Sequence, residues 1–315
     1  MAVLLEFEKK VERLRKKIEE LKEKGKHDPQ VIREIEEKFQ KKIEEFYSNL
    51  TPWDKVLLAR HPDRPHAIDF INNVFEEFVE LHGDRHCGDG KAIIAGFAYF
   101  KGIPVCVIAQ EKGRDTKDKI TRNFGMPTPE DYRKALRVMK LAEKFGKPII
   151  TLVDTPGAFP GIEAEEHGQS EAIAKNLLEM SKMKVPIISV IIGEGGSGGA
   201  LAISVANRLL MYENAVYSVI SPEGCAAILW QSQDKVKEAA EALKLTSKYL
   251  KELGIIDDII PEPLEGAHKD YKFTFKKFEE YVEKHLKELL KMSPEELKED
   301  RYRKFRKIGS YQSQE

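Results

Sequence analysis

The sequence predicts an α/β protein in which a largely parallel sheet is covered by helices on both faces. Short, almost wholly apolar strands alternate with helical segments over residues 131–221, which is typical of strands buried on both faces. Glycine-rich turns follow two of these strands, and charged helical segments flank the region at both ends of the chain.

Composition excludes several classes of protein. The 315 residues carry a formal net charge of −1, which argues against bulk nucleic-acid binding. The longest apolar runs, such as 187–192, are far shorter than the ~20 residues that span a bilayer, and the first residues do not resemble a secretory leader. We therefore expect a cytoplasmic protein that binds neither nucleic acid nor membrane.

The cysteines are few and widely separated. Cys87, Cys106 and Cys225 form no C-x-x-C pair. We expect buried or partly buried free thiols and no metal site within this chain. His61, His82 and His86 show no metal-ligand spacing either, and we expect them at surface or turn positions.

The first fifty residues are expected to form a helical hairpin. Half of them are charged, and apolar residues recur every three or four positions over 7–21 and again over 32–50, the spacing of one apolar helix face. Gly25 and the cap-like pair Asp28-Pro29 separate the two runs. The narrow seam favours self-packing or docking to a subunit over membrane association.

The central elements follow from the spacing of apolar residues. Residues 68–81 are predicted as a helix, and 92–100 and 103–110 as a β-hairpin joined at Lys101-Gly102. Beyond them, helices are predicted at 131–145, 169–182 and 198–206, strands at 148–154, 185–192 and 216–221, and further charged helix over the last fifty residues.

The most informative segment is the glycine-rich loop 193–202, which follows a predicted strand and opens a predicted helix. The first amides of a helix have no partner within the helix and favour negative charge. Glycine lets a ligand approach those amides without meeting a Cβ. Such a loop can hold an anion with main-chain donors alone.

Three motifs overlap in this loop. Gly193-x-Gly195-x-x-Gly198 fits the dinucleotide fingerprint, with Glu213 at about the right distance. Gly195-x-Ser197-x-Gly199 fits a nucleophile elbow, with His268 downstream. The third interpretation is an oxyanion hole of paired amides without a side-chain nucleophile. A tight turn for close packing of helix on sheet also explains the glycines, whereas a P-loop is excluded because no lysine follows them.

A second glycine loop, Asp154-Thr155-Pro156-Gly157-Ala158-Phe159-Pro160-Gly161, follows the preceding strand. Its first four residues mimic a GTPase switch motif, but no phosphate-binding lysine loop accompanies them. Glycine loops at the carboxyl ends of two strands are expected to line one crevice, the place where open α/β sheets bind ligands.

Several motifs in fixed order resemble one family. They are the segments 112–117, 122–126, 132–137, 154–157, 168–174, 193–202 and 218–225. With the helical N-terminus and Arg60-His61-Pro62, they make nearly the whole chain similar to the carboxyltransferase α subunit of bacterial acetyl-CoA carboxylase.

The sequence departs from that family's pattern at four places. Ala109-Gln110-Glu111-Lys112 stands where Gly-His-Gln-Lys is usual, Phe159 replaces a common tyrosine and His167 a common arginine. His86-Cys87-Gly88 is also unusual. These departures concern side chains at the edge of the expected pocket rather than the glycine loops.

The resemblance implies a crotonase/ClpP-like ββα spiral core over residues 66–263, an N-terminal helical hairpin and connector over 1–65, and a C-terminal helical tail over 264–315. It implies transfer of the carboxyl group from carboxybiotin, on a biotin carboxyl carrier protein, to acetyl-CoA. The product is malonyl-CoA, in the first committed step of fatty acid synthesis. The implied assembly is α2β2 with a zinc-ribbon β subunit that is needed for activity, and biotin carboxylase is a further partner.

The implied chemistry gives the loops their roles. Biotin's own nitrogen can take the proton from acetyl-CoA, so the protein has to stabilise oxyanions rather than supply a base. The amides of Gly198 and Gly199 are expected to form an oxyanion hole, with Ser197 as a small loop residue. Substrate contacts are expected from Gly195, Gly196, Gly157, Phe159 and Gly161, and contacts to CoA phosphates or an acidic partner face from Arg114, Lys117 and Arg122 within the basic segment 112–122.

Other functions stay open. An adaptor subunit could keep the fold without catalysis, although the glycine pair argues against it. A serine hydrolase on the related ClpP-type fold would need histidine and aspartate partners for Ser197. A different acyl-CoA, such as propionyl-CoA, also stays open, since the acyl pocket is expected to lie largely on the partner.

Overall fold

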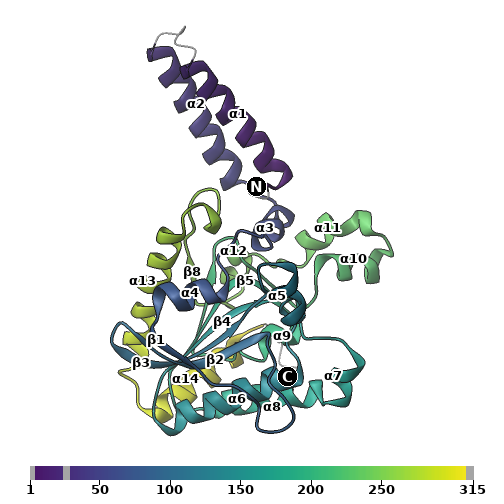
Figure 1. Cartoon of the computed structure of the whole chain (residues 1–315), viewed down its shortest axis with the longest axis vertical. Helices are drawn as coiled ribbons and strands as arrows, with labels where there is room; N and C mark the ends of the chain where they lie inside the picture. Colours follow the sequence, from purple (N-terminus) through teal and green to yellow (C-terminus); the bar gives the residue numbers. More distant parts are fainter. Residues whose placement is uncertain (1–3, 24–28, 310–315) are drawn as a thin grey trace, which may run out of the picture.

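The computed structural model describes residues 4–23 and 29–309, so the predicted break at Gly25 and cap at Asp28 lie outside the described residues. Within these ranges the chain forms one eight-stranded sheet with the order β1-β2-β3-β4-β5-β6-β8 and with β7 paired to β5 (Figure 1). The neighbours from β3 through β8 are parallel, whereas β1, β2 and β3 form an antiparallel meander. The largely parallel sheet predicted from the sequence is confirmed.

The strands are β1 Glu76–Glu80, β2 Ile93–Phe100, β3 Ile103–Gln110, β4 Ile149–Thr155, β5 Ile187–Gly196, β6 Arg208–Tyr212, β7 Val216–Ser218 and β8 Asp258–Ile260. The helices are α1 Glu6–Glu23, α2 Pro29–Ser48, α3 Pro52–Ala59, α4 Ala67–Val74, α5 Thr116–Thr121, α6 Pro129–Lys144, α7 Ile162–Glu166, α8 Gln169–Lys182, α9 Ser197–Leu201, α10 Pro222–Trp230, α11 Val236–Ala242, α12 Ser247–Glu252, α13 Tyr271–Leu289 and α14 Pro294–Lys307. No helix in the described ranges is both long and apolar enough to span a membrane.

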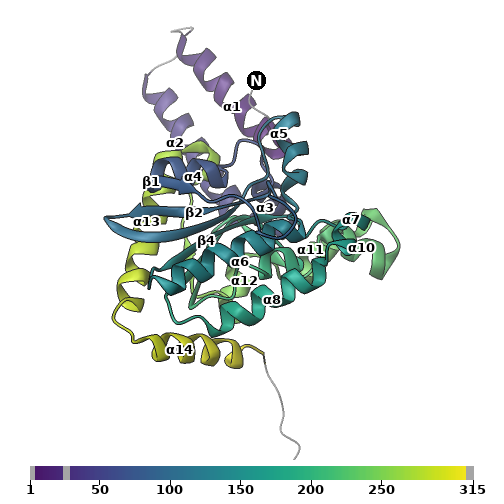
Figure 2. The ribbon, with the colours of Figure 1, turned by 60° about the horizontal axis from the view of Figure 1, so that its bottom comes forward.

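Helices cover both faces of the sheet. α4 and α13 lie on one face, α6 and α8 lie on the other, and α14 packs outside α8 (Figure 2). Every residue of β4 is buried, and so is nearly all of β5. This two-sided burial explains why both strands read as continuous apolar runs rather than as alternating ones.

The predicted helix over 68–81 is wrong in its second half. α4 ends at Val74, and Glu76–Glu80 instead forms the edge strand β1, antiparallel to β2. Phe75, Phe78 and Val79 have a spacing that suits a helix, but the free edge of β2 offers this segment a ladder of hydrogen bonds. Tertiary pairing of this kind overrides local propensity.

The N-terminal hairpin is confirmed and is attached to the core at its base. Glu8 of α1 is buried beside the edges of two stacked histidine rings, His61 and His268, whose centroids are 3.9 Å apart. Glu8 Oε1 lies 2.8 Å from His268 Nε2, and Oε2 lies 3.3 Å from His61 Nε2. His61 is therefore a buried anchor rather than a surface residue, and it stands at a turn, as the other half of the expectation had it, since the Arg64 amide donates to the His61 carbonyl at 2.9 Å.

Candidate functional site

The two glycine loops meet through their main chains at the carboxyl ends of β4 and β5. A Cβ on Gly196 would lie 2.1 Å from the carbonyl oxygen of Pro156, and one on Gly199 would lie 2.5 Å from the amide nitrogen of Ala158. Backbone atoms cannot move aside as a side-chain tip can, so glycine alone fits at both positions. Both loops were expected to line one crevice; the structure shows them packed against one another, and the crevice itself stays a prediction.

The helix that opens from the first loop is short. α9 spans Ser197–Leu201, whereas 198–206 was predicted, and its N-cap residue, Gly196, supplies no side-chain cap. The first amides of such a helix have no acceptor inside it. A Cβ on Gly198 would meet nothing closer than 3.8 Å, and a cavity of about 330 Å³ opens beside Gly198 and Tyr217. The loop thus has both main-chain donors and adjacent space.

Gln110, one of the departures from the family pattern, joins the two loops. Its Nε2 donates to the carbonyl oxygen of Gly199 at 2.8 Å, and its Oε1 accepts from the amide of Asp154 at 3.2 Å. The Tyr132 hydroxyl donates to the same Gly199 oxygen at 3.3 Å. A fully buried side-chain amide therefore fixes the position of α9 relative to the end of β4.

A buried ionic cluster lies directly beneath the loops. Lys112 Nζ is 2.7 Å from Asp154 Oδ1 and 2.6 Å from Glu194 Oε2. Arg60 bridges Glu194 and Glu223, at 2.5 Å from each. Burial opposes ionisation of Glu194, but Lys112 and Arg60 outweigh it and lower the pKa of Glu194 to about 2. Lys112 is thus a cation held inside the chain by two carboxylates, unlike the exposed part of the basic segment 112–122.

The predicted basic contacts are partly occupied within the chain. Arg114 pairs with Asp69, and Arg122 binds Asp118 Oδ1 at 2.7 Å and the Lys91 carbonyl at 2.9 Å. Lys117 on α5 is exposed. Contacts from these three residues to a CoA phosphate stay a prediction.

Packing explains some of the predicted substrate glycines. A Cβ on Gly195 would lie 2.5 Å from the Tyr217 ring, and one on Gly161 would lie 2.4 Å from the Phe159 ring. Gly157 has a φ of 153° and open space around it. The amide of Phe159 donates to Pro127, and its carbonyl accepts from the buried Gln169 at 2.9 Å. Gln169 is therefore a support of the second loop.

The structure does not place the side chains that a nucleophile elbow or a dinucleotide site would need beside the first glycine loop. Ser197 has a positive φ of 49°, as at a nucleophile elbow, but the histidines with identified partners in the described ranges meet groups elsewhere. Carboxylates bind His66, His82, His167, His268 and His285, and His61 lies against Glu8. Glu213 accepts from the amide of Glu262 at 3.3 Å, so it is committed to a loop contact rather than a ribose site.

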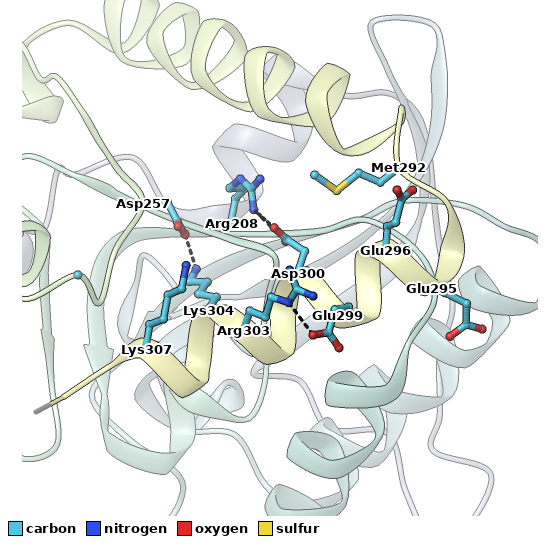
Figure 3. A pocket seen from close by; sticks show the side chains of 11 residues that line it. Arg208, Asp257, Met292, Glu295, Glu296, Glu299, Asp300, Arg303, Lys304 and Lys307 are labelled. Atoms are coloured by element: carbon cyan, nitrogen blue, oxygen red, sulfur yellow. Dashed lines mark hydrogen bonds and ion pairs between the residues drawn. The ribbon is translucent and has the colours of Figure 1, made fainter. Parts of the chain in front are cut away.

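A separate groove lies at the opposite end of the sheet from these loops. About 920 Å³ in volume, it lies under α14 against Arg208 and Asp257, at the starts of β6 and β8, whereas the glycine loops follow the ends of β4 and β5 (Figure 3). Six of its charged residues pair with one another: Asp257 with Lys304, Arg208 with Asp300 and Glu299 with Arg303. It offers no group for the expected chemistry.

Comparisons with known proteins agree on one family. The family described as acetyl co-enzyme A carboxylase carboxyltransferase-like matches residues 4–309. The acetyl-coenzyme A carboxylase carboxyl transferase subunit alpha of Staphylococcus carnosus (strain TM300) is 54% identical over 315 residues, which cover 99% of this chain and 100% of the relative. The subunit of the same name from Geobacter metallireducens (strain ATCC 53774 / DSM 7210 / GS-15) is 56% identical over 310 residues, 98% of each chain.

Solved structures share the core. Transcarboxylase 12S, with methylmalonyl-coenzyme A and methylmalonic acid bound, matches with a TM-score of 0.57 at 22% identity, over 69% of this chain and 41% of that one. A Pseudomonas malonate decarboxylase hetero-tetramer in complex with coenzyme A matches with a TM-score of 0.56 at 18% identity, over 68% and 85%. At these identities the likeness concerns the fold, which is the crotonase-like fold that the resemblance implied.

Proposed function

Because the chain belongs to the family of acetyl-CoA carboxylase carboxyl transferase alpha subunits, we propose that the amides of Gly198 and Gly199 form its oxyanion hole. The enzyme class rests on the family. The assignment of the amides rests on one observation: two glycine loops pack main chain against main chain at the start of an uncapped helix. Preorganised amides of this kind stabilise a developing oxyanion without having to reorient.

The proposed reaction needs no side-chain base. Carboxybiotin, a substrate borne by a carrier protein, releases its carboxyl group as CO2, and charge develops on the ureido oxygen. The ureido nitrogen takes a proton from the methyl group of acetyl-CoA, and the resulting carbanion attacks the CO2. The products are biotin and malonyl-CoA, so atoms and charge balance. The Gly198 and Gly199 amides would stabilise the ureido oxyanion, and the cavity of about 330 Å³ beside Gly198 gives the ring a place to bind.

The second oxyanion, on the thioester, is assigned to a beta subunit. An alpha subunit implies such a partner, and exposed apolar side chains suit one: Val219, which lines the cavity, and Ile228 and Leu229 of α10 are between 67% and 76% exposed. We propose an α2β2 assembly in which the zinc-ribbon beta subunit covers this surface, with biotin carboxyl carrier protein and biotin carboxylase as further components. Lys117 is proposed to contact CoA phosphate. The cytoplasmic location stays a prediction.

The first experiment measures carboxyl transfer from malonyl-CoA to a free biotin derivative, by the chain alone and with a candidate beta subunit. We expect activity only in the mixture. Activity of the chain alone would overturn the shared site, and a stable complex without activity would favour the adaptor function.

A variant at Ser197 tests whether the loop amides or the serine hydroxyl carry the chemistry. Ser197→Gly removes the hydroxyl and suits the positive φ of 49° at this position. We expect this variant to keep carboxyl transfer in the mixture. Loss of transfer in a folded complex would assign the chemistry to the serine and refute the oxyanion hole.

A further inference from the structure

Three metal-binding side chains from distant parts of the sequence meet at the rim of the second glycine loop. Cys87 lies in the connection between β1 and β2, Glu130 in the first turn of α6, and His167 directly after α7. Glu130 Oε1 is 3.3 Å from Cys87 Sγ and 2.6 Å from His167 Nδ1. All three donor atoms lie within 4.8 Å of one another.

The separations suit a tetrahedral zinc ion. Bonds of about 2.3 Å to sulfur and about 2.0 Å to oxygen and nitrogen place sulfur about 3.5 Å and nitrogen about 3.3 Å from the oxygen. The sulfur–oxygen distance already agrees. The shorter nitrogen–oxygen contact is a hydrogen bond that the metal would replace, and the His167 side chain is 51% exposed and so has room to turn.

The surroundings leave a position for a fourth ligand. A cavity of about 320 Å³ is lined by Cys87, Glu130 and His167 together with Phe159 of the glycine loop. A water molecule or an outside ligand could complete the tetrahedron there. The site is therefore open, in contrast to a closed structural zinc site with four protein ligands.

Arg133 supports the donor set from behind. Its Nη2 is 3.1 Å from Cys87 Sγ and 3.2 Å from Glu130 Oε1, while its Nε donates to the buried Asp84 at 2.9 Å. Hydrogen bonds of this kind hold metal ligands in place.

Two of the residues that depart from the family pattern lie together in this cluster. Cys87 and His167 each depart from the family pattern, and both contact the same carboxylate. The sequence showed no metal-ligand spacing because Cys87 and His167 stand 43 and 37 positions from Glu130.

We propose that Cys87, Glu130 and His167 bind one Zn²⁺ ion, with the fourth position open to the cavity beside Phe159. The ion would tie the β1–β2 connection to α7 at the edge of the second glycine loop. This site lies beyond the proposed carboxyl transfer and does not depend on it.

The test uses the full chain, freed of metal by chelation, and Co²⁺ as a spectroscopic probe. We expect one Co²⁺ per chain and the near-ultraviolet absorption band of a cobalt–thiolate bond, which added Zn²⁺ removes. Cys87→Ser should abolish the band, and His167→Gln should weaken binding by at least about tenfold. Cys225→Ser is the matched control, because that thiol is buried elsewhere, and it should keep the band.

The result can fail in distinct ways. The proposal would be overturned if the cobalt–thiolate band persisted in Cys87→Ser. It would also be overturned if Cys87→Ser, His167→Gln and Cys225→Ser all bound Co²⁺ with the same affinity. The absence of any band in the unaltered chain would overturn it as well. If Cys87→Ser does not fold in chelator, as judged by thermal unfolding, the weakened binding of the half-exposed His167→Gln variant decides the question.

Discussion

Replacing Lys112 by methionine tests how much the buried ion pairs of Lys112 stabilise the glycine loops, because it leaves the loop amides themselves unchanged. Lys112 Nζ is the cation between Asp154 and Glu194, and both carboxylates are buried. Methionine keeps much of the side-chain length and removes the charge, so the packing changes little and the ion pairs are lost.

The structure sets the expected cost. Removing one partner of a buried ion pair typically costs about 3–5 kcal/mol, because the other charge stays buried and unpaired. Arg60 still pairs with Glu194, so Asp154 bears most of the loss, although its Oδ1 still accepts from the Glu194 amide at 2.9 Å. We therefore expect a value near the lower end, about 3 kcal/mol.

Urea unfolding followed by circular dichroism measures this loss. With a slope of about 3 kcal/mol per M, the midpoint should fall by roughly 1 M. Lys175→Met is the control, since Lys175 pairs with Glu171 at 3.5 Å on the surface and should cost under about 0.5 kcal/mol. A Lys112 variant whose midpoint matches that of the control would refute the claim that the cluster stabilises the loops.

Four further predictions concern Gly196, Gly198, Glu8 and Glu194. Gly196→Ala should cost about 1–3 kcal/mol and abolish carboxyl transfer, because its Cβ meets the Pro156 carbonyl. Gly198→Ala should leave stability within about 1 kcal/mol of the unaltered chain, and equal melting temperatures for both variants would contradict this. Glu8→Gln should cost about 1–3 kcal/mol and expose the hairpin to limited proteolysis before the core; unchanged cleavage argues against the anchor. In the folded protein the pKa of Glu194 is lowered from its ordinary value of 4.5 to about 2. The ionised carboxylate therefore stabilises the fold above pH 4.5, and this stability is lost as the pH falls toward about 2. The urea midpoint should accordingly fall between about pH 5 and pH 3, and it should fall less in Glu194→Gln.

Elements whose side chains face one environment could be predicted from the sequence. Residues 169–182 were predicted as a helix and form α8 with the same ends, and the buried strands β4 and β5 were found from their apolar runs. The edge strand β1 was not, because it depends on a partner distant in sequence. The short strands β6 and β8 escaped notice too, since three to five residues carry little periodicity.

The candidate site also has parts that the sequence could predict and parts that it could not. The glycine loops were found because main-chain approach needs glycine itself, a signal within one short segment. The cluster of Lys112, Asp154, Glu194 and Arg60 was missed, because charged residues far apart in sequence show no sign of their pairing. The role of Gln110 likewise depends on the carbonyl of Gly199, 89 positions away.

The anchor at Glu8 constrains how the protein forms during synthesis. The hairpin consists of local contacts and can fold soon after it leaves the ribosome. Its bond to His268, however, joins residues 260 positions apart. At 5–20 residues per second, roughly 10 to 50 seconds separate the two ends of that bond. During this interval the apolar seam between α1 and α2 has to hold the hairpin together without the core, so the seam, more than the anchor, determines whether the nascent N-terminus resists proteolysis.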